Sequence, residues 1–151
     1  MPEPSLANDA WEALLTAHAA VMKQLAAEDT WTDVSMREYD VLYTLSKYPD
    51  PLRLSELNRH VLLSQPALSR LVERLAERGL VERHADPADG RGVRLSLTAA
   101  GRTTQRAIGR RHARSVARAM SAGLTRAEME QLETICRKLA RASDKSEVLV
   151  T

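Results

Sequence analysis

The sequence predicts a mainly α fold: a winged helix-turn-helix with a small two-stranded wing (α+β), flanked by N- and C-terminal helices that form a dimerisation region. Two short helical segments joined by a tight turn and followed by two alternating strands predict the winged part. The 151 residues include no Phe, two Trp and three Tyr, so the core depends on Leu, Val and Ala, which suits helices. Basic charge is concentrated in residues 53–118, which hold fourteen Arg against six acidic residues, whereas residues 1–52 hold nine acidic against three basic residues.

The first two helices are predicted from apolar spacing and from a cap. Apolar residues at a loose helical period predict a helix over about residues 6–27, and residues 1–34 are interpreted as an N-terminal dimerisation region. Ser35-Met-Arg-Glu38 has the spacing of a capping box, in which the hydroxyl and the carboxylate each accept from a backbone amide of the first turn. A second helix therefore begins here, and Pro49-Asp-Pro51 ends it.

A third, short helix over residues 55–61 and a fourth over about residues 65–78 form the predicted helix-turn-helix. Ser64 is a natural N-cap for the fourth helix, and Gly79 is a typical residue just after a helix end. Apolar residues at i, i+3, i+4 and i+7 predict its inner face, which consists of Leu68, Leu71, Val72 and Leu75.

The wing and the C-terminal helices follow. Residues 80–84 and 93–97 are predicted strands, and residues 86–91 between them are dense in turn formers. Thr98 caps a long helix to about residue 122, and Thr125-Arg-Ala-Glu128 is a second capping box that opens a last helix to about residue 142. The resulting division is a winged domain over residues 35–98, C-terminal dimerisation helices over residues 99–142, and a flexible tail over residues 143–151.

The outward face of the fourth helix indicates DNA recognition. A single helix fits the major groove of DNA, a helix N-terminus attracts phosphate, and small polar residues permit close approach to base edges. The competing interpretation is a solvated surface helix of an ordinary α+β protein. The residues predicted to face DNA are Ser64, Gln65, Pro66, Ser69, Arg70 and Arg74.

Five motifs in order give the sequence a family resemblance. They are Leu54-Ser-Glu-Leu, the segment from Ser64 to Leu75, Gly79-Leu-Val-Glu-Arg83, Asp86-Pro-Ala-Asp-Gly-Arg91 and Leu97-Thr-Ala-Ala-Gly101. Together they resemble the MarR family of bacterial transcription regulators. The resemblance implies a sequence-specific DNA-binding regulator, in most members a repressor. It also implies a homodimer on a pseudo-palindromic operator, with DNA release by a small molecule or by oxidation.

The resemblance also predicts the wing contacts. Asp89 and Arg91 match the family's wing positions, where the acid commonly orients the Arg at the tip, so we expect Asp89 to hold the Arg91 guanidinium. Arg94 on the returning strand is a further predicted DNA contact.

The family resemblance also implies a pocket for an effector molecule. Large aromatic side chains gather in the first 43 residues, and a family ligand pocket between the dimer helices and the winged domain would suit a small aromatic or phenolic ligand. An alternative is that the same side chains form the dimer core, and the sequence leaves both open. The residues concerned are Trp11, His18, Trp31, Tyr39 and Tyr43.

Other classes of protein are disfavoured. The sequence has none of the common catalytic motifs, so we expect no enzyme activity and no cofactor. The four His and the single Cys136 lack metal-ligand spacing, and Cys136 is expected to be an inert thiol on an apolar helix face. No signal peptide or membrane span is visible, so we expect a cytoplasmic protein. The alternative function is a helical dimer that binds a protein or small molecule while its winged domain is idle.

Overall fold

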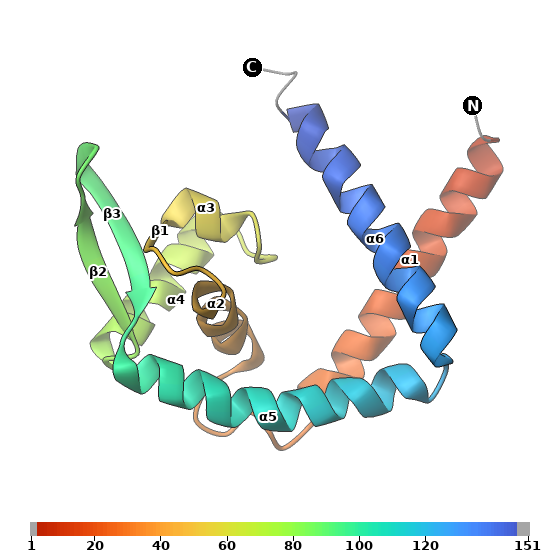
Figure 1. Cartoon of the computed structure of the whole chain (residues 1–151), viewed down its shortest axis with the longest axis horizontal. Helices are drawn as coiled ribbons and strands as arrows, with labels where there is room; N and C mark the ends of the chain where they lie inside the picture. Colours follow the sequence, from red (N-terminus) through yellow and green to blue (C-terminus); the bar gives the residue numbers. More distant parts are fainter. Residues whose placement is uncertain (1–2, 148–151) are drawn as a thin grey trace. The chain divides into compact units, whose positions relative to one another are not determined.

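The computed structural model describes the backbone of residues 3–147 and the side chains of residues 3–144. Figure 1 shows the order of elements, which confirms the predicted mainly α, winged helix-turn-helix fold. The chain divides into two compact units, residues 1–113 and residues 114–151, and the division falls within one helix. The elements are α1 (Pro4–Ala26), α2 (Met36–Ser46), β1 (Leu52–Arg53), α3 (Leu54–Asn58), α4 (Gln65–Glu77), β2 (Val81–Asp86), β3 (Asp89–Leu97), α5 (Ala99–Ser121) and α6 (Arg126–Glu147).

The predicted two-stranded wing forms from β2 and β3, and a third strand that was not predicted, β1, joins the same sheet. The strand order is β1-β3-β2, and both pairs are antiparallel. Strand β1 has only two residues, too few for a periodic pattern in the sequence, and it pairs Leu52 with Leu95. The turn is also tighter than predicted, because β2 ends at Asp86 and β3 begins at Asp89.

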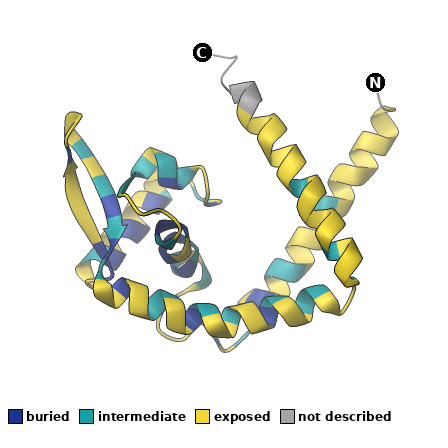
Figure 2. Cartoon of the chain, viewed as in Figure 1, coloured by how far each residue is buried: buried dark blue, intermediate teal, exposed yellow. Residues whose placement is uncertain are grey.

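A single apolar core lies in the first unit, between the helix-turn-helix and the base of the wing. Leu42, Leu57, Leu68 and Leu75 are fully buried there, and Figure 2 shows buried residues on α2 and α4. All four residues predicted for the inner face of α4 are buried. Truncating one buried Leu to Ala typically lowers the stability of the fold by about 2–5 kcal/mol. The buried side chains therefore hold α4 in one orientation, which determines the face that it turns outward.

The predicted caps form as hydrogen-bonded turns. The Ser35 hydroxyl accepts from the Glu38 amide at 3.2 Å, and the Glu38 carboxylate accepts from the Ser35 amide at 2.9 Å. Thr125 and Glu128 make the same reciprocal pair at the start of α6. Gly79 has φ of 71°, in the left-handed region that favours glycine after a helix.

The last helix is longer than predicted. It continues to Glu147, so residues 143–147, which the sequence placed in a flexible tail, are helical. No Gly or Pro interrupts this stretch, and the apolar period that marked the helix simply ends earlier than the helix does. The remaining residues of the predicted tail, 148–151, lie outside the described residues. Among the described helices, none combines the length and the apolar character needed to span a bilayer.

Candidate nucleic-acid interface and adjoining cavity

Helix α4 presents a polar face opposite its buried one. The residues predicted to face DNA are all exposed, and Ser64 also has a structural role, because its hydroxyl accepts from the Ala67 amide at 3.3 Å. That cap leaves Gln65 and Pro66 in the first turn, with Ser69 and Arg70 one turn further along. The exposed set is Ser64, Gln65, Pro66, Ser69, Arg70 and Arg74.

At the tip of the wing, Asp89 and Arg91 are both exposed at the start of β3. The interaction between them differs from the predicted one, since Asp89 Oδ1 accepts from the backbone amide of Arg91 at 3.0 Å. This bond shapes the chain two residues after the acid, a local motif that Asp forms readily. The acid therefore sets the backbone of the tip, where Arg91 is exposed.

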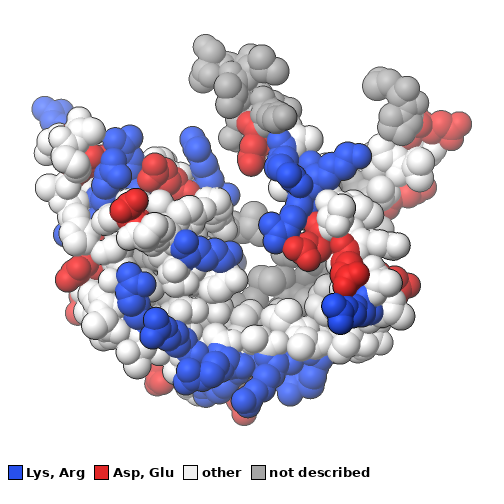
Figure 3. Space-filling view, viewed as in Figure 1, with Lys and Arg blue, Asp and Glu red and all other residues white. Residues whose placement is uncertain are grey.

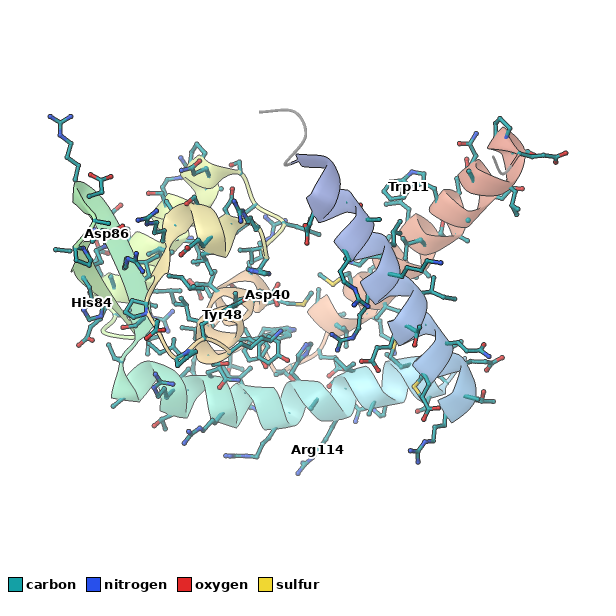
Figure 4. All side chains as sticks on the ribbon, turned by 45° about the horizontal axis from the view of Figure 1, so that its top comes forward. Trp11, Asp40, Tyr48, His84, Asp86 and Arg114 are labelled. Atoms are coloured by element: carbon teal, nitrogen blue, oxygen red, sulfur yellow. The ribbon has the colours of Figure 1, made fainter. Side chains whose placement is uncertain are left out.

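Arg94 has a different environment from Arg91. Its side chain is half-buried, and its Nε lies 3.2 Å from Oδ1 of Asp86. Asp86 is the residue that sequence analysis missed, since it was interpreted as a turn former, yet its side chain is only 1% exposed. Figure 4 shows it in the wing. Its partners come from separate strands: Arg53 Nε on β1 lies 2.7 Å from Oδ2.

The charge state of Asp86 follows from these contacts. The Ala88 amide donates to Oδ1 at 3.0 Å, and this bond, followed by the one from Arg53, lowers the pKa of the Asp86 carboxyl below its usual value. An ionised, buried carboxylate is stable only when its oxygens are satisfied, and here both are. The sequence shows Asp86 just after a predicted strand and Arg53 and Arg94 on two other segments. Their proximity can be predicted only when the register of the strands is known.

A cavity of about 560 Å³ lies in the first unit, between α1, α2 and the turn that precedes α4. Of the predicted effector residues, His18 and Tyr43 line it, and Trp11, Trp31 and Tyr39 are not among its walls. Its polar walls contain basic and aromatic groups that the sequence did not single out. The lining residues are His18, Ala19, Met22, Arg37, Asp40, Tyr43, Thr44, Lys47, Tyr48, His60, Val61, Leu62 and Leu63.

Trp31 and Tyr39 pack instead around an imidazole of α5. The His112 ring lies 5.1 Å from the Trp31 ring and 5.3 Å from the Tyr39 ring, centroid to centroid. Burial lowers the pKa of His112, and the nearby carboxylates of Asp40 and Glu28 oppose that shift. Trp31 also donates from its indole to the Leu25 carbonyl at 2.7 Å, which fixes the end of α1. Trp11 is 60% exposed on α1.

Helix α5 carries a stripe of arginine side chains at four-residue spacing. Figure 3 shows basic side chains gathered along this helix, and Figure 4 shows Arg114 extending away from it. Arg102, Arg106 and Arg110 are exposed, and no carboxylate of the described residues forms an ion pair with them. Like charges four residues apart repel on a helix, so this stripe favours anionic surroundings.

Comparisons with known proteins agree with this geometry. A sequence model of the MarR family matches residues 32–92, which span α2 to the wing tip. The chain is similar in structure to Sco3205, a MarR family transcriptional regulator from Streptomyces coelicolor solved in complex with DNA, with a TM-score of 0.76 and 25% identity over 94% of this chain and 92% of that one. AbsC, a MarR family regulator from the same organism, gives a TM-score of 0.76 and 26% identity, covering 91% of this chain and 94% of that chain.

A third relative was solved with a small molecule. The PcaV transcriptional regulator of Streptomyces coelicolor, in complex with its natural ligand, has a TM-score of 0.65 and 27% identity over 94% of both chains. The family match covers the helix-turn-helix and the wing, and the structural likeness extends over more than nine-tenths of the chain. This chain therefore matches the MarR family model over its helix-turn-helix and wing, and it is similar in fold to winged helix-turn-helix transcriptional regulators of that family.

Proposed function

We propose that this protein is a repressor that binds a pseudo-palindromic operator as a homodimer and is released by a small aromatic or phenolic ligand. The observation that carries the proposal is the two-faced α4: four fully or nearly buried side chains lock it into the core, and its other face is polar and exposed. A helix held in this way can place its N-terminal residues against base edges in the major groove. DNA-bound Sco3205 supports this placement by analogy.

The side chains of α4 have the chemistry for sequence reading. Gln65 suits bidentate pairing with adenine, and Ser69 is short enough to lie close to a base edge. Arg70, near the middle of the exposed face, suits guanine, whereas Arg74, one turn on, suits phosphate. At the wing, Arg91 extends from a backbone shaped by Asp89 and suits the minor groove.

Apolar side chains left exposed on the terminal helices support a homodimer. On α1, Leu6, Trp11 and Leu15 are each at least half exposed. On α6, Ile135 is 63% exposed and Leu139 is 51% exposed, while Cys136 between them is partly buried. Apolar surface of this kind commonly marks an interface. Two subunits would present two recognition helices about 34 Å apart, one turn of duplex, which requires a pseudo-palindromic site.

The cavity beside α2 supports release by a ligand. Arg37, Lys47 and His18 supply positive charge or hydrogen-bond donors, and the rings of Tyr43 and Tyr48 supply flat apolar surface. This combination suits a small aromatic ring that carries a carboxylate or a phenolic oxygen. The cavity also contacts residues 61–63 in the turn before α4, so a ligand that alters this turn would alter the recognition helix.

The test is a salt titration followed by selection. Affinity for random duplex is measured by fluorescence anisotropy between 50 and 200 mM salt, and a protein making several phosphate contacts loses affinity steeply over that range. Binding selection on random DNA, with and without benzoate and phenol derivatives, then identifies the operator and the ligand class. A nearly flat salt dependence with negligible affinity would instead support the helical dimer whose winged domain is idle.

A further inference from the structure

Three strands meet at one buried carboxylate in the wing. Asp86 ends β2, and its two oxygens contact Arg53 Nε on β1 and Arg94 Nε on β3, at 2.7 and 3.2 Å. The Ala88 amide closes the turn onto the same carboxylate. With its side chain 1% exposed, Asp86 is more deeply buried than either arginine.

The strand register explains why this acid is needed. Arg53 and Arg94 are direct partners across β1 and β3, so their side chains share one face of the sheet, and Arg94 is also paired with His84 of β2. Like charges directly opposite each other destabilise a strand pair. Asp86 is the carboxylate that both arginines contact, so it turns a repulsive pair into a bridge across the sheet.

One of these arginines also begins the helix-turn-helix. Arg53 is the N-cap residue of α3, and its backbone amide donates to the Glu56 carboxylate at 2.7 Å. The same residue thus fixes the first helix of the motif through its backbone and the wing through its side chain. The first helix of the helix-turn-helix and the wing are therefore joined at Arg53.

We infer that Asp86 is a positioning residue for DNA binding, which fastens the wing to the start of the helix-turn-helix through Arg53 and Arg94. This inference rests on the proposed DNA-binding function. Asp86 does not touch DNA in this account; it determines where Arg91 is held relative to α4. The base of β3 is held in the core by Leu95 and Leu97, whereas β1 pairs with β3 over only two residues, so the bridge adds to a short strand pairing.

The sign of the effect of Asp86→Asn separates positioning from simple electrostatics. Removing a negative charge from a DNA-binding domain strengthens binding to phosphate if charge alone matters. Positioning predicts the opposite: Asp86→Asn lowers operator affinity about tenfold, the worth of one lost wing contact. Glu82→Gln is the matched control, because Glu82 is a carboxylate of the same strand with a 60% exposed side chain, and its removal leaves affinity unchanged or slightly higher.

Footprinting locates the loss. Hydroxyl-radical protection of the minor groove weakens in Asp86→Asn, while methylation protection of the major groove by α4 persists. Equal loss of both protections, or affinity equal to or above that of Glu82→Gln, would overturn the inference.

Arg53→Met, which keeps Asp86, remains informative if Asp86→Asn does not fold, and a double-mutant cycle measures the coupling between the two residues where both variants fold. Arg53→Met retains the Arg94–Asp86 contact, and Arg53→Met with Asp86→Asn removes the repulsion between the two arginines together with the bridge. The inference predicts that the double variant binds no more weakly than the poorer single variant. If the losses of binding free energy in the two single variants add up in the double variant, Arg53 contacts phosphate independently of Asp86. That result would contradict the proposed role of the Asp86 bridge.

Amide hydrogen exchange of the free protein keeps this test separate from the proposed function. The Ala88 amide and the β3 amides that face β1 exchange faster in Asp86→Asn and Arg53→Met than in wild type, whether or not the protein binds DNA. Unchanged exchange rates at these amides would by themselves overturn the inference that Asp86 fastens the wing. If these amides exchange faster in both variants but the wild-type protein does not bind duplex DNA, the proposed function is wrong. The bridge of Asp86 with Arg53 and Arg94 remains in that case.

Discussion

The phenol oxygen of Tyr48 lies 3.0 Å from Nε2 of His60, so the segment after α2 is hydrogen-bonded to the segment between α3 and α4. Their rings lie 5.7 Å apart, centroid to centroid, and both residues line the cavity. A ligand that enters there meets this bond directly. The pair thus connects the cavity wall to the turn that leads into the recognition helix.

Tyr48→Phe is expected to weaken the ligand response and to leave ligand-free DNA binding nearly unchanged, because the ring stays and the bond to His60 is lost. The measurement is operator anisotropy during titration with benzoate and phenol derivatives. Tyr43→Phe is the matched control, since Tyr43 lines the same cavity and its ring is covered by the Lys47 ammonium at 4.1 Å. If both variants respond to ligand as wild type does, the Tyr48–His60 bond has no part in release.

Arg70→Ala and Arg74→Ala are expected to separate specificity from affinity. Loss of a guanine contact costs roughly 1–3 kcal/mol and relaxes preference at one base pair of each half-site, as we expect for Arg70. Loss of a phosphate contact weakens all sequences alike, as we expect for Arg74. Each variant is measured on the operator and on its single-base-pair mutants. If Arg70→Ala weakens binding to every sequence by the same factor, Arg70 contacts the DNA phosphate backbone and does not read a base.

Arg91→Ala is expected to reduce operator affinity and to lower the slope of log affinity against log salt by about one. The reason is that an exposed guanidinium at the wing tip can neutralise one phosphate or enter the minor groove. Thermal unfolding should be unaffected, since the side chain makes no core contact. An unchanged salt slope would leave Arg91 as a solvated loop charge.

Gly101→Ala is expected to destabilise the fold by about 1–3 kcal/mol. A Cβ at this position would overlap the backbone carbonyl oxygen of Leu80, where the start of α5 crosses the end of the helix-turn-helix. Backbone cannot move aside as a flexible side chain can. Gly123→Ala is the control, because no heavy atom lies within 4 Å of the added carbon. Urea unfolding of both variants tests the difference, and equal midpoints would contradict it.

The stability of the first unit is expected to fall with acidification near pH 6.5 because of His112. Burial lowers the pKa of this imidazole, so the unfolded chain takes up its proton at a higher pH than the folded protein does. Stability is therefore complete above the usual His pKa of about 6.5 and declines below it. His112→Phe, which keeps a ring between Trp31 and Tyr39, should flatten the dependence of Tm on pH between about 7.5 and 5.5. A profile parallel to that of wild type would show that another group is responsible.

Local chemistry made the helices and caps predictable from the sequence. Ser35 with Glu38, Thr125 with Glu128, and Gly79 each act within one turn of chain, and all three features form as predicted. Likewise, the spacing of the apolar residues in α4 determines its buried face whatever the remainder of the chain does.

Features that depend on strand register were not predictable. Asp86 bonds to Arg53, which lies 33 positions away in the sequence. Strand β1 has only two residues, too few to produce a periodic pattern. The cavity was predicted only in part for the same reason. His18 and Tyr43 line it, but Arg37, Lys47 and His60 come together only through the crossing of separate helices, and the bulky Trp31 and Tyr39 pack around His112 instead.

The arginine-only character of α4, the wing and α5 has a practical consequence. Residues 53–118 contain no Lys, and the four lysines of the chain are Lys23, Lys47, Lys138 and Lys145. Acetylation removes the charge of lysine but cannot act on a guanidinium, so this basic surface keeps its full charge whatever the acetylation state of the cell. Amine-reactive dyes will likewise spare it. Lys47 lies in the wall of the cavity, so a bound ligand would block its labelling.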